Sequence, residues 1–160
     1  METGYDLRFD RGDETPARLK GQFSRLVGMT AAQTRRVAAD ALSAVGAHKD
    51  HFVVLAALVE FGPASQADLS RRTRIFKSDL VSVLNDLETD RLVRRAPDPD
   101  DKRRNVITVT AAGKRRLTEL TGILDDVNDH FMAPLSAAER TQLFALLGRI
   151  NAHLAEPDAD

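Results

Sequence analysis

Apolar residues recur every three or four positions through most of the chain, and this spacing predicts a mainly helical protein. The first periodic segment begins at Thr15-Pro16, where the pattern indicates an N-cap followed by proline at the first helical position. It predicts one long helix that ends at Val45. A second helix is expected over residues 49–61, because the run HFVVLAALVEF stops at Gly62-Pro63, which cannot continue it.

Two shorter periodic segments follow in the centre of the chain. Ser65 opens SQAD, a start similar to a capping box, and predicts a helix that ends near Arg72. After the connection TRIF, a helix over residues 77–90 places its apolar side chains on one face. The opposite face has short side chains that would let another surface approach closely, and it consists of Ser78, Val81, Ser82, Asn85 and Thr89.

The runs LVRRA and NVITVT are rich in β-branched residues and alternate in polarity, so they predict an antiparallel hairpin from Leu92 to Val109. The loop between them, PDPDDKRR, is longer than most hairpin loops, and long loops on rigid hairpins are more often functional. This loop ends in three consecutive basic residues, Lys102, Arg103 and Arg104.

Two further helices are expected after the hairpin. Thr110 is a plausible N-cap for a long helix that ends near Pro134, although Gly113 and Gly122 weaken that helix locally. The sequence Ser136-Ala-Ala-Glu139 is a capping box that starts the last helix. The first, fifth and sixth helices carry more apolar surface than a domain of this size needs, which predicts a homodimer.

Composition narrows the classes of function. The chain has no cysteine, which excludes disulfides, thiolate metal sites and cysteine nucleophiles. Residues 66–116 hold thirteen basic and eight acidic side chains, a formal charge of +5 against −6 for the remainder. Such a basic centre is typical of a polyanion-binding surface.

No apolar run is long enough to span a membrane and no signal peptide is recognisable, so we expect a cytoplasmic protein that does not bind membranes.

Three short helices followed by a hairpin are the element order of a winged helix-turn-helix. The expected fold is therefore mainly α with an α+β wing, flanked by long N- and C-terminal dimerisation helices. Residues 48–110 would form the DNA-binding domain, and residues 15–47 and 111–155 the dimerisation helices. Residues 1–14 are expected to form a flexible arm, and residues 156–160 a frayed tail.

The stretch DLETDRLVRRAPDPDDKRRNVITVTAAG, residues 86–113, resembles the end of the recognition helix, the wing and the next helix of MarR-family transcriptional regulators. The resemblance extends from about Thr15 to Leu154. It implies an obligate homodimer whose two winged helices bind a pseudo-palindromic site on double-stranded DNA, most often as a repressor. The alternative is a winged helix used for protein contact, or an architectural DNA-binding module without an effector.

The resemblance also implies roles for individual residues. Asp101-Lys102-Arg103 matches the family's Asp-x-Arg wing tip, so Arg103 would enter the minor groove and Asp101 would orient it. The recognition helix would enter the major groove with five residues facing base edges: Lys77, Ser78, Val81, Ser82 and Asn85. Four residues are expected to contact phosphates: Ser65, Arg71, Lys102 and Arg104.

The chain departs from the family pattern at four positions near this surface. Many relatives carry Asp or Asn where this chain has Phe76, glycine where it has Arg74 and Arg91, and arginine where it has Ser82. Absence of that arginine makes the recognition helix less basic than usual, and Phe76 cannot supply the usual N-cap. We therefore do not expect this protein to recognise the same DNA sequence as its relatives.

Several members of the family that this chain resembles bind anionic aromatic ligands near the start of the second helix, where this chain has His48 and His51. These histidines could bind a small anionic aromatic effector when protonated, or could cap the helix start. A metal site would need a third ligand such as Asp50, His130 or His153, at no diagnostic spacing, so no metal or cofactor is expected. The chain lacks a phosphate-binding glycine loop, a nucleophile elbow and a zinc-protease motif, which argues against an enzyme.

Overall fold

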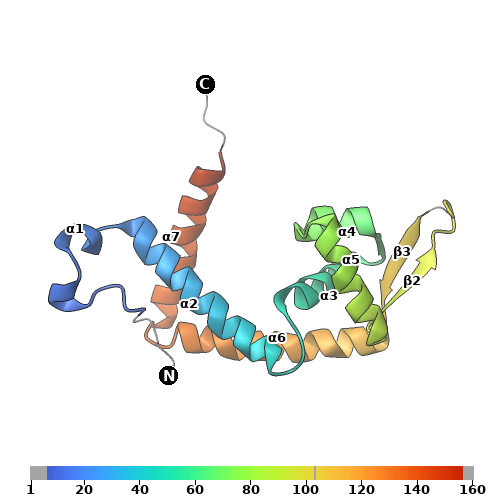
Figure 1. Cartoon of the computed structure of the whole chain (residues 1–160), viewed down its shortest axis with the longest axis horizontal. Coiled ribbons are helices and arrows are strands. Elements are labelled where there is room, and N and C mark those ends of the chain that lie inside the picture. Colours follow the sequence, from blue (N-terminus) through green and yellow to red (C-terminus); the bar gives the residue numbers. More distant parts are fainter. Residues whose placement is uncertain (1–6, 103, 157–160) are drawn as a thin grey trace. The chain divides into compact units, whose positions relative to one another are not determined.

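A computed structural model describes residues 7–102 and 104–156 of the chain (Figure 1). The elements, in order, are η1 (Gly12–Glu14), α1 (Ala17–Lys20), α2 (Phe23–Ser43), α3 (Lys49–Phe61), β1 (Ala64–Ser65), α4 (Gln66–Thr73), α5 (Lys77–Thr89), β2 (Val93–Pro97), β3 (Asn105–Val109), α6 (Ala111–Phe131) and α7 (Ala137–Ala155). The chain divides into two compact units, one ending at Leu124 and the other beginning at Asp125. The predicted fold, mainly α with a small β wing, is confirmed.

The first unit contains α3, α4 and α5 together with a three-stranded antiparallel sheet of order β1-β3-β2. In the β2–β3 hairpin, Val93 pairs with Val109 and Arg95 pairs with Ile107. The core of this unit is a single cluster of buried side chains contributed mainly by Leu42, Val54, Leu55, Leu58, Leu69, Leu80, Val83, Leu84, Leu87, Val93, Ile107 and Leu120. Burial of α5 on only one side leaves its predicted polar face towards solvent.

The first predicted helix is wrong in its extent, because two helices occupy the segment. α1 ends at Lys20, and α2 begins only after Gln22, whose backbone is extended. Gly21 accounts for the break, since glycine has low helix propensity. The predicted N-cap is also wrong: Pro16 occupies that position, and Thr15 Oγ1 instead accepts a hydrogen bond from the Arg11 amide at 2.9 Å.

The predicted arm, residues 1–14, is described from residue 7 onward, where it contacts α2. The Arg25 guanidinium donates to the Phe9 carbonyl at 2.7 Å and lies 4.7 Å from the centre of the Phe9 ring. The Gln33 side chain donates to the Leu7 carbonyl at 2.8 Å. These bonds attach residues 7–9 to the first long helix.

The later helix starts follow the predicted caps. Thr110 Oγ1 accepts from the Gly113 amide at 3.0 Å, and α6 continues through both of its glycines. At the start of α7, Ser136 and Glu139 form both arms of the capping box. In the second unit, Arg140 also binds Asp129 of α6 at 2.9 Å. No residue of α7 is buried.

No helix in the described part of the chain has the length and apolar character needed to cross a lipid bilayer.

Arg74 and Arg91, the two positions where the family resemblance predicts glycine, both have left-handed backbones, with φ of 58° and 59°. Arg74 ends α4, and Arg91 lies in the turn between α5 and β2. A residue with a Cβ atom in this conformation is less stable by about 1 kcal/mol, whereas glycine adopts it without this cost.

We therefore expect Arg91→Gly to raise the free energy of unfolding by about 0.5–1 kcal/mol, measured by urea denaturation. A suitable control is Arg94→Gly, which removes the same exposed charge from strand β2 and should lower stability because glycine weakens strands. Equal losses in the two variants would show that Arg91 carries no backbone strain.

Candidate nucleic-acid interface

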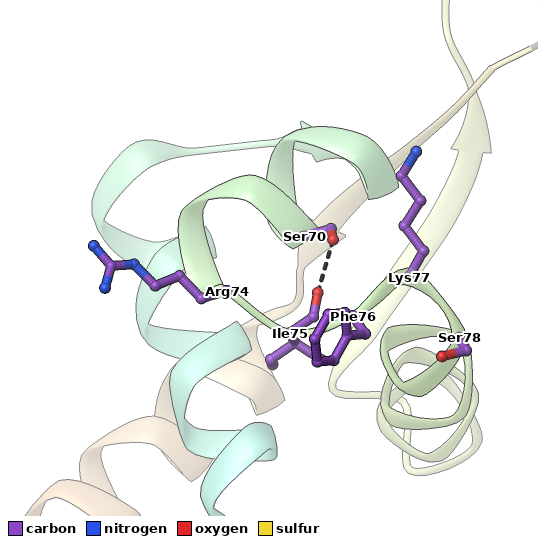
Figure 2. Close-up of a pocket in the computed structure, with 6 residues that line it drawn as sticks. All are labelled: Ser70, Arg74, Ile75, Phe76, Lys77 and Ser78. Carbon is purple, nitrogen blue, oxygen red and sulfur yellow. Dashed lines mark hydrogen bonds between the residues drawn. The ribbon is translucent and has the colours of Figure 1, made fainter. Parts of the chain in front are cut away.

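The turn between α4 and α5 is fixed by local contacts (Figure 2). Ser70 Oγ donates to the Ile75 carbonyl at 2.7 Å, and the Ile75 side chain is buried. Phe76 takes the N-cap position of α5 without a side-chain cap, and 78% of its surface is exposed. Together with Lys77, these residues line a hollow of about 560 Å³ at the start of α5. Figure 2 shows Arg74 and Lys77 extending from the turn in different directions.

The outward face of α5 is exposed as predicted. Lys77, Ser78, Val81, Ser82 and Asn85 are all exposed. The four apolar positions on the other side are buried: Leu80, Val83, Leu84 and Leu87. A helix buried on one side and lined by short polar side chains on the other has the shape that fits a DNA major groove.

Arg95 of β2 joins the wing to α5. Its guanidinium donates two hydrogen bonds of 2.8 Å to Asn85 Oδ1 and one of 3.0 Å to Glu88 Oε2. Its amide also donates to Glu88 Oε1 at 3.1 Å. The Asn85 oxygen is therefore engaged within the protein. Bidentate pairing of Asn85 with adenine, which uses this oxygen and the amide nitrogen, would require these bonds to rearrange.

The wing loop is organised by its own backbone. The Asp98 amide donates to the Arg104 carbonyl at 2.8 Å, and the Arg104 amide to the Asp101 carbonyl at 2.9 Å. The Asp98 side chain accepts from the Asp100 amide at 2.9 Å. Lys102 is exposed beside this turn. Arg103, the expected minor-groove residue, lies outside the described residues.

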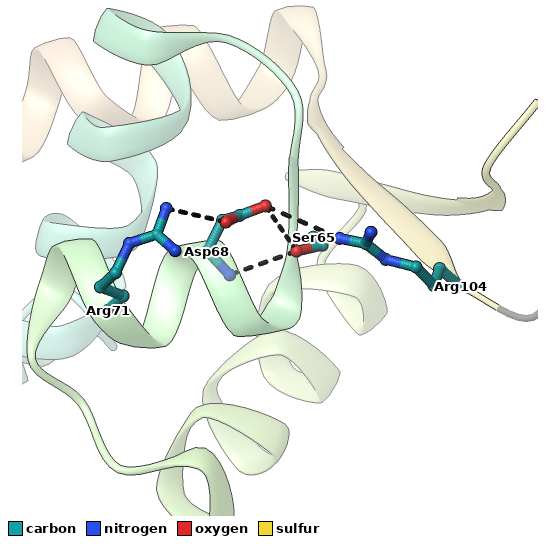
Figure 3. Close-up of polar contacts among 4 residues, drawn as sticks. All are labelled: Ser65, Asp68, Arg71 and Arg104. Carbon is teal, nitrogen blue, oxygen red and sulfur yellow. Dashed lines mark hydrogen bonds and ion pairs between the residues drawn. The ribbon is translucent and has the colours of Figure 1, made fainter. Parts of the chain in front are cut away.

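Asp68 on α4 contacts Arg71 and Arg104, the two arginines that are expected to bind phosphates (Figure 3). One of its oxygens accepts from Arg71 at 2.9 Å; the other accepts from Ser65 Oγ at 2.7 Å and lies 3.9 Å from the Arg104 guanidinium. The Ser65 hydroxyl first, and then the two arginines, hold the pKa of this carboxyl below its usual value. Arg71 and Arg104, from different elements, are thus brought to one edge of the interface.

Ser65, a predicted phosphate contact, is engaged in hydrogen bonds within the protein. It is only 7% exposed, its hydroxyl donates to Asp68, and its oxygen accepts from the Asp68 amide at 3.2 Å as the N-cap of α4. The capping prediction is confirmed. Little of its side-chain surface is therefore left to contact DNA.

His48 and His51 lie together at the start of α3, with ring centres 3.6 Å apart. His48 is the N-cap, but its side chain makes no capping hydrogen bond, so the alternative that it caps the helix through its side chain is wrong. His51 Nε2 lies 3.6 Å from Asp86 Oδ2 on α5. Among the described residues, Asp86 rather than Asp50, His130 or His153 completes a cluster of three groups able to bind a metal ion.

The comparisons with known proteins agree with this geometry. The MarR family model matches residues 49–104, which run from α3 to the end of the wing loop. The transcriptional regulator HosA of Escherichia coli O111:H- is 34% identical over 101 residues, or 63% of this chain and 74% of HosA. The chain belongs to the MarR family. The repressor NicR of Pseudomonas putida is 30% identical over 62% of this chain, and the match spans 63% of NicR.

A solved structure of Bordetella bronchiseptica BpsR has the same fold, with a TM-score of 0.72 over 91% of this chain and 100% of BpsR. Its sequence is 23% identical, and its DNA binding is regulated by 6-hydroxynicotinic acid. HosA and NicR are transcriptional regulators, as the MarR family is, and not enzymes.

Sequence reasoning missed two residues of this region, Arg95 and Asp86, and it gave Asp68 only a role at the start of α4. The alternation of β2 could have indicated Arg95, because it follows buried Val93 by two positions and so lies on the same side of the strand. No comparable pattern indicates that Asp86 would meet a histidine 35 positions earlier.

Proposed function

We propose that the protein is a transcriptional regulator that binds a pseudo-palindromic site on double-stranded DNA as a homodimer. The observation that carries this proposal is the exposed face of α5, held beside a basic wing by Arg95. A helix in the major groove and a wing on the adjacent backbone are the docking geometry of this fold. As an intracellular DNA-binding protein, it would act in the cytoplasm.

The proposed DNA contacts fall into those with base edges and those with the phosphate backbone. Ser78, Val81 and Ser82 would face base edges, and Lys77 would reach a base or phosphate from the first turn of α5. Arg71, Lys102 and Arg104 would contact phosphates. Because Asp68 already neutralises part of the charge of Arg71 and Arg104, a phosphate would compete with this carboxylate for both guanidinium groups. Arg103 would enter the minor groove beside Asp101, as the resemblance to the family implies.

Repression, with DNA binding regulated by a small molecule, is the mode that the relatives support. NicR is a repressor, and the DNA binding of BpsR is regulated by a hydroxylated aromatic acid. We propose that this protein also represses transcription and responds to a small effector. A predicted contact for an anionic aromatic effector is the pair His48 and His51, but the nearby Asp86 carboxylate would repel such an anion.

The test is selection of bound sequences from a random DNA pool, followed by measurement of affinity at two salt concentrations. The expected result is an inverted repeat bound by the wild type. Ser82→Glu, which places a carboxylate against the DNA, and Arg103→Ala should each weaken specific binding by about 1–3 kcal/mol.

Arg115→Ala is the matched control, because it removes one exposed positive charge from α6 outside the proposed interface. Its affinity should stay within a factor of about two of the wild type. If no sequence is enriched, or if Ser82→Glu and Arg103→Ala both bind the selected repeat like the wild type, α5 and the wing do not read DNA. The winged helix would then be a protein-contact or architectural module.

A further inference from the structure

We propose that His48, His51 and Asp86 form a binding site for a divalent transition-metal ion between the start of α3 and the recognition helix α5. One ligand atom from each residue lies within 4.8 Å of the others. The proposal that an ion binds depends on these three residues alone. The proposal that the ion changes the affinity for DNA also depends on the function proposed above.

The strongest observation is the state of His51. Its Nε2 atom is buried, has no hydrogen-bond partner among the described residues, and lies 3.6 Å from Asp86 Oδ2, which is too long for a hydrogen bond. A buried imidazole nitrogen without a partner is unfavourable unless something binds it.

The spacing of the three groups suits one small ion. Ligand atoms around a tetrahedral zinc ion lie about 3.3 Å apart when each bond is about 2.0–2.1 Å. The His51–Asp86 pair is already close to this spacing. The His48 side chain is exposed and that of Asp86 is 54% exposed, so both have room for the small rotation that would bring them to the ion.

The donor set decides the class of ligand. Two imidazole nitrogens and one carboxylate suit Zn²⁺, Co²⁺ or Ni²⁺, whereas Mg²⁺ and Ca²⁺ prefer oxygen donors. An anionic aromatic acid fits less well, because its carboxylate would approach that of Asp86. The cation would neutralise Asp86 and supply the missing partner of His51.

The site would link two elements with different roles. Asp86 immediately follows Asn85, which faces the proposed DNA surface and is bound by Arg95. His48 and His51 belong to the start of α3, at the edge of the core. An ion held by both elements would fix the orientation of α5 and so change the affinity for DNA.

The decisive experiment is titration of the metal-free protein with Co²⁺, followed by visible absorption, and with Zn²⁺ by calorimetry. We expect one ion per chain. His51→Gln, Asp86→Asn and His48→Gln should each weaken binding of the ion at least tenfold. Because His48 is exposed, its variant should fold even if the His51 variant does not. His153→Gln on α7 is the matched control and should bind like the wild type.

Three results would overturn the proposal: no ion bound at micromolar concentration, equal affinity in the three site variants and the control, or binding of benzoate that depends on His51 while no metal binds. Because the titration contains no DNA, its failure is separate from failure of the regulator proposal, which would appear in the DNA selection. A metal-bound protein that also selects an inverted repeat should bind it with altered affinity, and Asp86→Asn should remove that difference.

Discussion

Leu147→Asp is expected to convert the proposed dimer into monomers and to raise its dissociation constant at least about 100-fold. The reason is the state of α7, which buries none of its residues within one chain. Its apolar side chains are 37–75% exposed, and they are Leu143, Phe144, Leu146, Leu147, Ile150 and Leu154. A second copy would cover this surface, and an unpaired carboxylate buried there would cost more than about 3 kcal/mol. Sedimentation over a range of concentrations measures the change.

Ala145→Asp is the matched control, because it adds the same charge to the same helix about 160° away from Leu147. Ala145 is exposed, so its variant should remain dimeric. A Leu147→Asp protein that sediments as a dimer at micromolar concentration would show that α7 does not form the interface. Loss of the dimer should also weaken binding to an inverted repeat, since each half-site needs one winged helix.

The elements that the sequence predicted well are those whose ends are set by local chemistry. α3 begins and ends where the apolar run and Gly62-Pro63 indicated, and α7 begins at a complete capping box. The buried face of α5 follows directly from its helical spacing. Caps and periodicity depend on residues within one or two turns, so the chain itself contains the information.

The parts that were missed depend on contacts between distant residues. β1 has only two residues and exists because Ala64 and Ser65 pair with Ile107 and Val106. The engagement of Asn85 by Arg95, and the approach of Asp86 to His51, arise only once α3, α5 and β2 have assembled. Local periodicity predicted that Asn85 would be exposed, but it could not indicate that its oxygen already has a donor.

At Gly113 the helical pattern of the sequence and the packing of the structure favour different residues. As a glycine inside a predicted helix it lowers helix propensity, yet the structure requires it. A Cβ atom on Gly113 would collide with the Leu92 carbonyl oxygen and would lie 2.7 Å from Val109 Cγ2. The Leu92 carbonyl cannot easily move, because it accepts from the Thr110 amide at 2.9 Å where the hairpin meets α6. Glycine therefore allows α6 to begin directly against the wing.

We expect Gly113→Ala to lower the free energy of unfolding by about 3 kcal/mol, measured by urea denaturation, because backbone must shift to accommodate one methyl group. Gly122→Ala is the matched control: it lies in the same helix, and beyond its chain neighbours and the adjacent helix backbone no atom lies within 4 Å of the added Cβ. This control should keep or gain stability, by up to about 1 kcal/mol, because alanine is the better helix former. Equal effects at the two positions would mean that the hairpin tolerates displacement from α6. A loss confined to Gly113 would show that this contact fixes the base of the wing, and with it the position from which the wing loop could reach DNA.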